Sequence, residues 1–232
     1  MKLVFVGTGA GATFGSKRVK SSIYLKSDDG TSILLDLGTG ANFKIEDWNL
    51  LDFSSIFVTH LHIDHVSGIF DHLVQRKVLR MPEIEIYSPP GFNQLLESYK
   101  QTGNNISAIV KESKLPKAKI KDIEIYSVEA CHSIYAVSYV ITDGEKKILY
   151  TGDTSEPCES ILYEAKDANL IIHEGSCVND CKQYGHTSIG EIMNLFEPKK
   201  VIITHIPSQI ENQVKEIAKG YILAYDGMIL DV

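Results

Sequence analysis

The chain has 232 residues, of which 44% are hydrophobic and 23% are charged, with 7 prolines, 17 glycines and 4 cysteines. This composition is typical of a globular protein, and it excludes a disordered chain, a collagen-like repeat and a disulfide-stapled mini-protein. The formal net charge of −7 argues against non-specific binding of nucleic acid by the whole surface, but it does not exclude a local basic site.

No apolar run reaches the ~18 residues that a membrane-spanning helix needs. The apolar start of the chain, residues 1–6, ends at Gly7 and is too short for a secretory signal. We therefore expect a cytoplasmic protein that acts away from the membrane. The spacing of the last two cysteines is a weak metal signal on its own. We expect ordinary reduced thiols at Cys131, Cys158, Cys177 and Cys181.

Short runs of alternating or β-branched residues predict strands, and apolar residues at three-to-four spacing predict helices. The strands are predicted at 2–6, 22–27, 31–36, 55–59, 84–88, 123–129, 137–142, 146–151, 169–173, 200–204 and 221–225. A hairpin turn at 27–30 joins the second and third strands. The helices are predicted at 66–79, 91–101, 158–166, 187–196 and 208–219, and Thr187 or Ser188 with Glu191 suggests a capping box in the fourth. No repeat or linker interrupts this order, so we predict a single domain over residues 1–232, built of two sheet-containing halves.

A glycine-rich stretch follows the first strand as Gly7-Thr8-Gly9-Ala10-Gly11-Ala12, which formally satisfies a dinucleotide-binding fingerprint. That fingerprint requires a helix directly after the glycines, and Thr13-Phe14-Gly15-Ser16 is a poor helix start. We therefore favour a tight glycine loop that lines the rim of an active site.

The strongest chemical signal is the run Thr59-His60-Leu61-His62-Ile63-Asp64-His65, directly after a predicted buried strand. Ligand-capable side chains in a loop at a strand end can converge on one point, as those on a solvated face rarely do. Imidazole and carboxylate without thiolate suit Zn²⁺, with Fe²⁺ or Mn²⁺ as substitutes. His132, Asp153 and His205 each follow another predicted strand, and with the run they complete a set large enough for two metal ions.

These residues resemble the ordered motifs of the metallo-β-lactamase fold superfamily, which match Asp36, His60-x-His62-x-Asp64-His65, His132, Asp153 and His205. Within that superfamily the chain is similar to ribonuclease Z. The matching segments are Ile171-Ile172-His173-Glu174-Gly175-Ser176 for its HEAT motif, Gly185-His186-Thr187-Ser188 for its GHST motif, and Ala224-Tyr225-Asp226-Gly227-Met228 for its C-terminus. The resemblance implies an α/β fold, a four-layer αββα sandwich of two face-to-face mixed β-sheets with helices outside.

The resemblance also implies the layout of the site. One Zn²⁺ would be bound by His60, His62 and His132, the other by Asp64, His65 and His205, with Asp153 as the bridge. Catalytic roles would fall to Asp64, Glu174 and His186, the last two at the scissile phosphate and its leaving oxygen. A metal-bound hydroxide would attack a phosphodiester substrate, either a small molecule or RNA.

One departure from ribonuclease Z concerns the long arm that grips tRNA, which that family carries between the motifs of His132 and Asp153. Here only residues 133–152 lie between them. This favours a smaller phosphodiesterase of the same branch. Two basic stretches, Lys17-Arg18-x-Lys20 and Lys111 to Lys121, could contact RNA or form solvated edges.

Two other classes of function stay open from the sequence. A thioesterase or a lactonase would use the same metal site, and Glu174 and His186 argue against both. A non-catalytic scaffold would keep only the fold, and the full set of ligands argues against it. The aromatic content also permits a homodimer.

Overall fold

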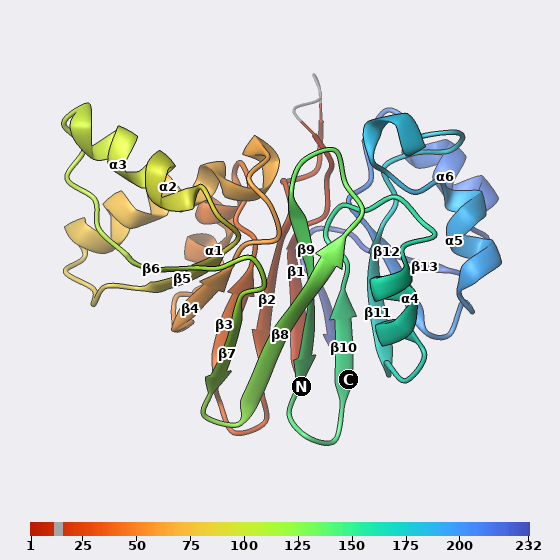
Figure 1. Cartoon of the computed structure of the whole chain (residues 1–232), viewed down its shortest axis with the longest axis horizontal. Coiled ribbons are helices and arrows are strands. Elements are labelled where there is room, and N and C mark those ends of the chain that lie inside the picture. Colours follow the sequence, from red (N-terminus) through yellow and green to blue (C-terminus); the bar gives the residue numbers. More distant parts are fainter. Residues whose placement is uncertain (12–15) are drawn as a thin grey trace.

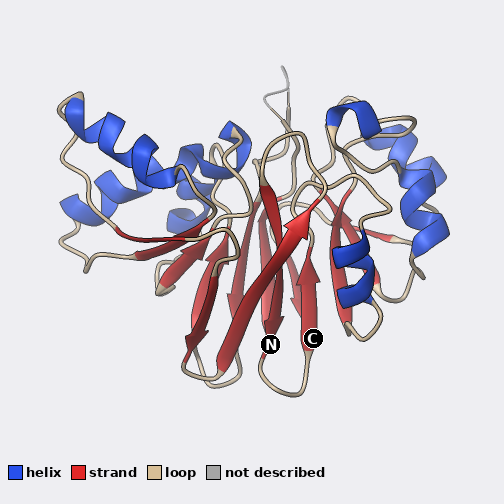
Figure 2. Cartoon of the chain, viewed as in Figure 1, coloured by secondary structure: helices blue, strands red, loops and turns tan. Residues whose placement is uncertain are grey.

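In a computed structural model, the described residues are 1–11 and 16–232, and they form four layers (Figures 1 and 2). Two sheets of seven strands each occupy the middle, and helices flank them on both sides. The predicted αββα sandwich with two mixed sheets is therefore confirmed.

The first sheet has the strand order β14-β1-β2-β3-β4-β5-β6. Its strands are β1 (Lys2–Gly7), β2 (Ser22–Lys26), β3 (Ser32–Leu35), β4 (Ser55–Phe57), β5 (Glu85–Ser88), β6 (Ile109–Glu112) and β14 (Met228–Asp231). The half around β1 and β2 is antiparallel, and β3 to β6 run parallel. The predicted hairpin turn is confirmed by a hydrogen bond of 3.0 Å that Gly30 N donates to Ser27 O.

The second sheet has the order β13-β12-β11-β10-β9-β8-β7. Its strands are β7 (Lys117–Ile120), β8 (Ile123–Ala130), β9 (Ala136–Thr142), β10 (Lys147–Tyr150), β11 (Leu170–Glu174), β12 (Val201–Thr204) and β13 (Ile222–Leu223). The strands from β10 to β13 are parallel. In parallel sheets, the loops that follow the carboxyl ends of the strands form the usual place for a binding site.

The helices divide between the two outer faces (Figure 1). The first sheet is covered by α1 (Ala41–Asp47), α2 (Ile63–Val78) and α3 (Phe92–Gln101), and the second by α4 (Glu159–Ala165), α5 (Ile189–Leu195) and α6 (Glu211–Ile217). The predicted capping box is confirmed with Ser188 as its first residue. Among the described helices, none combines the length and the apolar character needed to cross a membrane.

Several elements differ from the prediction. The short elements α1, β6, β7 and β14 were not predicted from the sequence, and β6 and β7 are edge strands in which exposed and half-buried residues alternate. The last helix begins at Glu211 because residues 207–210 form a turn, closed by a hydrogen bond from Ile210 N to Pro207 O. The second helix begins at Ile63, before the predicted start at residue 66, so Asp64 and His65 belong to its first turn.

The prediction of four reduced thiols is wrong in this structure, which contains two disulfides. Cys131 pairs with Cys158 across a Cα–Cα distance of 5.9 Å, within the usual range for a disulfide. Cys131 follows β8, and Cys158 precedes α4, which packs against β8. The second pair is Cys177 with Cys181. Sequence spacing does not reveal the first pair, because only the packing of α4 on β8 brings it together.

Aromatic contacts hold the two sheets together beneath the His60 loop. Phe57 on β4 stacks on Tyr87 at 4.7 Å between ring centroids and meets the ring of Tyr139 edge-on at 5.4 Å. Tyr139 belongs to the opposite sheet, and its hydroxyl donates a hydrogen bond of 2.8 Å to Val58 O. The strand that leads into His60 is therefore fixed against the second sheet.

Replacing Phe57 by alanine should test how much this contact stabilises the fold. We expect Phe57→Ala to lower the free energy of unfolding by about 3–5 kcal/mol, because a fully buried ring leaves a cavity. Phe43→Ala is the matched control, since Phe43 is 58% exposed and its loss should change stability by less than about 0.5 kcal/mol. Urea denaturation of both variants measures the difference. Equal losses would show that Phe57 does not carry the packing between the sheets.

Candidate metal centre

The predicted ligands meet at one edge of the sandwich. His60 and His62 lie between β4 and α2, while His132, Asp153 and His205 follow β8, β10 and β12. Asp64 and His65 come from the first turn of α2, where the sequence analysis expected a loop. The start of α2 therefore carries two of the donors, with their side chains fixed by the helix.

The first group of donors consists of His60, His62, His132 and Asp153. The Nδ1 atom of His62 lies 3.0 Å from His60 Nε2 and 3.1 Å from His132 Nε2. One donor atom from each of the four residues can be chosen so that all lie within 4.8 Å of one another. Three imidazole nitrogens and a carboxylate that converge in this way can hold a metal ion.

The second group consists of Asp64, His65 and His205, again with donor atoms within 4.8 Å of one another. Asp153 lies between the two groups. Its Oδ1 is 3.4 Å from His65 Nε2 and 3.2 Å from His205 Nε2, whereas its Oδ2 is 3.6 Å from His60 Nε2. Each oxygen of this one carboxylate thus faces a different group.

Polar partners hold the outer nitrogen of the ligand rings. His65 Nδ1 donates to Asp36 Oδ2 at 2.8 Å, and His132 Nδ1 donates to Gly185 O at 2.7 Å. His205 Nδ1 lies 2.6 Å from Ser21 Oγ. Such partners fix the orientation of a ring and leave its other nitrogen for a metal.

Two buried atoms in the centre lack a hydrogen-bond partner within the described chain, His65 Nε2 and Asp153 Oδ1. Unpartnered buried polar atoms are costly unless something else satisfies them. The donors converge, their outer nitrogens are engaged and these inner atoms are unsatisfied. The residues therefore fit a metal cofactor.

Asp36 is the buried anchor of the centre. It follows β3 in the left-handed region with φ of 53°, and its carboxylate accepts hydrogen bonds from Thr59 N and the Tyr150 hydroxyl, each at 2.8 Å, as well as from His65. Tyr150 belongs to the second sheet, so this one carboxylate connects both sheets to a ligand ring. His205 has a similar φ of 54° directly after β12. Both residues therefore leave the strand direction at the point where the site begins.

The electrostatics of the centre favour a cation. Burial lowers the pKa of His60 well below its usual value, which keeps the imidazole in the neutral form that binds metals. Burial alone would also lower the pKa of His65, but Asp153 and Asp36 outweigh it and raise that pKa well above its usual value. A proton and a metal ion compete for the same nitrogen, so the carboxylates that favour the proton also favour a cation.

Glu174 and His186 form a second functional pair beside the donors. The buried Glu174 accepts hydrogen bonds at Oε1 from His186 Nδ1 at 2.9 Å and from Thr187 N at 3.1 Å. Ser176 N donates to its other oxygen at 2.9 Å. Partial burial would lower the pKa of His186, but the hydrogen bond and charge of Glu174 raise it to about 9. The same Nδ1 atom lies 4.0 Å from Asp153 Oδ2.

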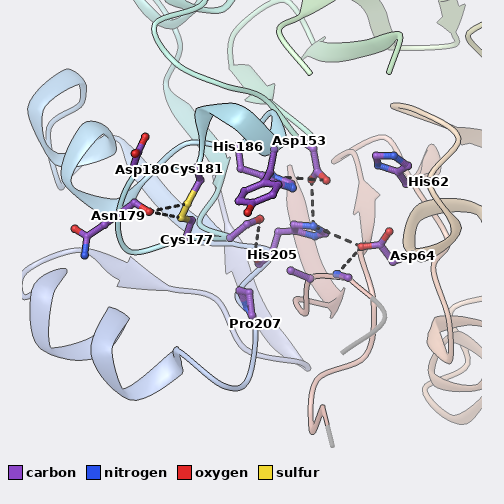
Figure 3. A pocket seen from close by; sticks show the side chains of 14 residues that line it. His62, Asp64, Asp153, Cys177, Asn179, Asp180, Cys181, His186, His205 and Pro207 are labelled. Atoms are coloured by element: carbon purple, nitrogen blue, oxygen red, sulfur yellow. Dashed lines mark hydrogen bonds and ion pairs between the residues drawn. A yellow bond between two sulfur atoms is a disulfide. The ribbon is translucent and has the colours of Figure 1, made fainter. Parts of the chain in front are cut away.

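The centre opens into a pocket with a volume of about 430 Å³ (Figure 3). Its lining residues are Ala10, Gly11, His62, Asp64, Asp153, Ser176, Cys177, Asn179, Asp180, Cys181, Tyr184, His186, His205 and Pro207. A pocket of this size accepts a small molecule and gives it direct access to the donors.

The glycine stretch lines the rim of this pocket, as predicted, through Ala10 and Gly11. Gly11 N donates a hydrogen bond of 2.7 Å to Asp64 Oδ2. The part of the prediction that concerns residues 12–15 lies outside the described residues. The loop therefore contributes a backbone amide to a metal donor.

Other predicted residues lie apart from the pocket. His173 is buried behind Glu174, where its Nδ1 donates to Glu174 O at 2.8 Å. In the first basic stretch, the Arg18 side chain pairs with Glu211 at 3.2 Å and Lys20 Nζ donates to Ala10 O at 2.8 Å. Both side chains are therefore engaged within the chain, and contact of this stretch with RNA stays a prediction. The five lysines of the second stretch are exposed, and their contact with RNA stays a prediction.

Sequence reasoning missed several residues that serve the site. Ser21 and Tyr150 precede or end strands and carry hydroxyl groups, a signal too common to single them out. Gly185 acts through its carbonyl oxygen, which no side-chain motif reports. Tyr184 lines the pocket, and its position directly before the GHST-like motif could have indicated this.

Known proteins that are similar in structure and sequence indicate the fold and the family of this chain. A solved structure of a metallo-β-lactamase fold protein, YhfI from Bacillus subtilis, superimposes with a TM-score of 0.79 at 19% identity, covering 99% of this chain and 98% of that one. The human tRNase Z, short form (ELAC1), superimposes with a TM-score of 0.80 at 20% identity, covering 100% and 99%. A Ribonuclease Z from Methanosarcina acetivorans is 24% identical, over 99% of this chain and 95% of the relative.

Fold and site together define a metallo-β-lactamase fold protein with a candidate metal centre at the edge of its sheets, similar to ribonuclease Z proteins in sequence and structure. The family model described as "Anti-Pycsar protein Apyc1" matches residues 1–223. The chain belongs to this Apyc1 family.

Removing the charge of Asp36 tests its role as the buried anchor. We expect Asp36→Asn to lower the free energy of unfolding of the metal-free protein by about 2 kcal/mol or more, because an amide replaces a carboxylate that accepts several buried hydrogen bonds. Tyr150→Phe removes only one of those bonds and should cost about 1 kcal/mol. Urea denaturation compares the two variants. An Asp36→Asn variant with the same free energy of unfolding as the wild type would contradict the anchor role.

Proposed function

We propose that the chain is a zinc-dependent phosphodiesterase that uses two metal ions. The observation that carries this proposal is the Asp153 carboxylate, which faces a separate group of donors with each of its oxygens. The Ribonuclease Z relatives and a "Zinc phosphodiesterase ELAC protein 2" from Macaca fascicularis, 29% identical over 75% of this chain and 25% of that protein, support the choice of metal and reaction.

The assignment of residues follows from the two groups. His60, His62 and His132 would hold one ion and Asp64, His65 and His205 the other, with Asp153 shared between the two groups. Two bound ions would supply positive charge that draws electron density from the phosphoryl oxygens of a substrate. This charge also makes the pocket attractive to an anion within a protein whose net charge is −7.

Residues of the chain itself move the protons. Protonated His186 has two N–H groups, and one of them is committed to Glu174. The other is available to donate a hydrogen bond or a proton to the leaving oxygen, because His186 lines the pocket. Asp64 lines the same pocket, and its carboxylate can accept a proton from the attacking water. Burial would raise the pKa of Asp64, but His65 and His205 outweigh it and keep that pKa below its usual value.

The structure favours a small substrate. Residues 133–152 form a short loop, β9, a tight turn and β10, in which Glu145 N and Lys146 N donate to Asp143 Oδ1 at 3.0 and 2.8 Å. This segment is the place of the tRNA-gripping arm in the ribonuclease Z resemblance. A pocket of about 430 Å³ suits a small phosphodiester, and the family name points to an anti-Pycsar role for its hydrolysis.

Metal analysis tests the two-ion assignment. Protein purified without chelators should contain about two transition-metal ions per chain, and chelation should abolish activity until Zn²⁺ or Mn²⁺ is added back. Asp153→Ala should lose turnover and at least part of the metal, because two like charges then face each other with less compensation. Elemental analysis and activity assays on the same samples give the answer. A metal-free wild type without gain on addition of Zn²⁺, or an active Asp153→Ala variant, would contradict the assignment.

His186 separates phosphodiester hydrolysis from other hydrolysis. We expect His186→Ala to lower kcat on bis-p-nitrophenyl phosphate by about 10²-fold or more, because a positioned acid is lost. Its metal content and melting temperature should stay close to those of the wild type, since His186 belongs to neither donor group. Lys182→Ala, at an exposed position nearby, is the control.

The same assay includes a thioester and a lactone as competing substrates. The phosphodiesterase proposal would be overturned if the wild type hydrolysed the thioester or the lactone faster than the phosphodiester. An unchanged kcat in His186→Ala would overturn it as well.

A further inference from the structure

Two buried titratable side chains, Glu156 and His173, lie behind the metal centre. Glu156, in the loop between β10 and α4, is 1% exposed, and His173 on β11 is fully buried. Neither side chain lines the pocket that contains the metal donors. Side chains of this kind are rarely buried without a partner, because their removal from water is costly.

Glu156 and His173 face each other. The Oε1 atom of Glu156 lies 3.6 Å from His173 Nε2, and neither atom has a hydrogen-bond partner among the described residues. The other ring nitrogen, Nδ1, donates to the Glu174 carbonyl oxygen and therefore carries a proton. Lone pairs on Oε1 and Nε2 would repel each other, whereas a proton on either atom makes the contact attractive. The two side chains therefore form a pair that holds one proton between them.

The backbone around Glu156 is bonded to the residues that hold the Glu174 carboxylate. Glu156 N donates to Thr187 Oγ1 at 3.0 Å, and the Thr187 hydroxyl donates to Thr154 O at 2.7 Å. Thr154 N and Thr187 N in turn donate to Glu174 Oε1, at 3.3 and 3.1 Å. The same oxygen accepts the hydrogen bond from His186 Nδ1. A shift of the Glu156 loop would therefore move two of the donors that orient this carboxylate.

His173 holds the backbone of the same glutamate. Glu174 is the last residue of β11, and its carbonyl oxygen accepts from His173 while its side chain accepts from His186. The ring of His173 also packs on Phe196, at 5.4 Å between ring centroids. The pair thus connects the loop after Asp153 to the end of the strand that carries Glu174.

We propose that Glu156 and His173 form a buried positioning pair, which holds the Glu174 carboxylate where it orients His186 toward the leaving oxygen. The inference rests on the proposed function, in which His186 is the proton donor. Both members are positioning residues, because neither reaches the pocket. A displacement of about 1 Å in a catalytic group can lower a rate by about 10²-fold, so a remote pair can have a measurable effect.

Two phosphodiesters with different leaving groups test the pair. The p-nitrophenolate released from bis-p-nitrophenyl phosphate is a stable anion, whereas the phenolate released from diphenyl phosphate is more basic and depends more on a proton donor. We expect Glu156→Ala to lower kcat by about 10²-fold on diphenyl phosphate and by only about 10-fold on bis-p-nitrophenyl phosphate. KM for both esters should change by less than about twofold, because the pair does not line the pocket.

A conservative variant and a control accompany this measurement. In Glu156→Gln the amide can donate to His173 Nε2 and its oxygen can still accept from Cys158 N, so kcat should stay within about threefold of the wild type. Glu159→Ala removes an exposed carboxylate at the start of α4 and should leave kcat on both esters unchanged.

NMR of the histidine rings in the metal-loaded protein tests the pair without turnover. The His186 ring N–H that is bonded to Glu174 should give a signal that is absent in His186→Ala. Glu156→Ala should shift this signal and speed the exchange of its proton with water, while Glu156→Gln and Glu159→Ala should not. His173→Asn breaks the pair from the other side, because its amide can replace the Nδ1 donor but ends short of Glu156. It should have the effect of Glu156→Ala, and it replaces that variant if Glu156→Ala does not fold.

Equal losses of kcat on the two esters, or an unchanged His186 signal in the folded variants that break the pair, would overturn the positioning role and leave the phosphodiesterase proposal standing. Failure of the metal-loaded wild type to cleave either ester would instead overturn the proposed function. The NMR measurement would in that case still show whether Glu156 and His173 hold the His186 ring in place.

Discussion

The buried carboxylate of Asp153 is the element on which the site depends. It is surrounded by imidazole nitrogens of four histidines from three segments of the chain, at distances between 3.2 and 3.9 Å. Burying a carboxylate raises its pKa, yet His205 and His65 hold the pKa of Asp153 well below its usual value. Such an arrangement is stable only with compensating positive charge, from protons or from metal ions. The inner nitrogens of these histidines are therefore better suited to binding a cation than to forming hydrogen bonds.

The sandwich supplies the rigidity that this arrangement needs. Val137 N of β9 donates to Thr59 O at 2.9 Å, and Tyr150 of β10 donates to Asp36, so the second sheet is bonded to the start of the histidine run and to the carboxylate that holds the His65 ring. Phe57 and Tyr139 fill the space beneath. A displacement of either sheet would separate His132, Asp153 and His205 from the donors on the first sheet. The geometry of the site consequently depends on the packing of the core.

The chemistry of the pocket follows from that geometry. Glu174 fixes His186 from behind, and the Gly185 carbonyl fixes His132, so the loop that joins β11 to α5 orients a proton donor and a metal donor at once. The same loop carries Tyr184 into the wall of the pocket. One short segment therefore supports a metal donor and a proton donor and also lines the pocket.

The candidate ligands could be predicted from the sequence, because the position of a polar residue after a strand is a local property, and the class of fold followed from the resemblance to the metallo-β-lactamase fold superfamily. His60, His62, Asp64, His65, His132, Asp153 and His205 are all brought to one edge of the sheets, as predicted. The edge strands β6 and β7 were missed because their alternation is weak and mostly exposed. Three sets of contacts became visible in the tertiary structure alone. The ligand rings are held by Asp36, Ser21 and Gly185. The side chains of Arg18 and Lys20 bind other parts of the chain, and Cys131 pairs with Cys158. All of these contacts except that of Lys20 with Ala10 join segments far apart in the chain, and a local sequence pattern does not contain the packing that sets their distances.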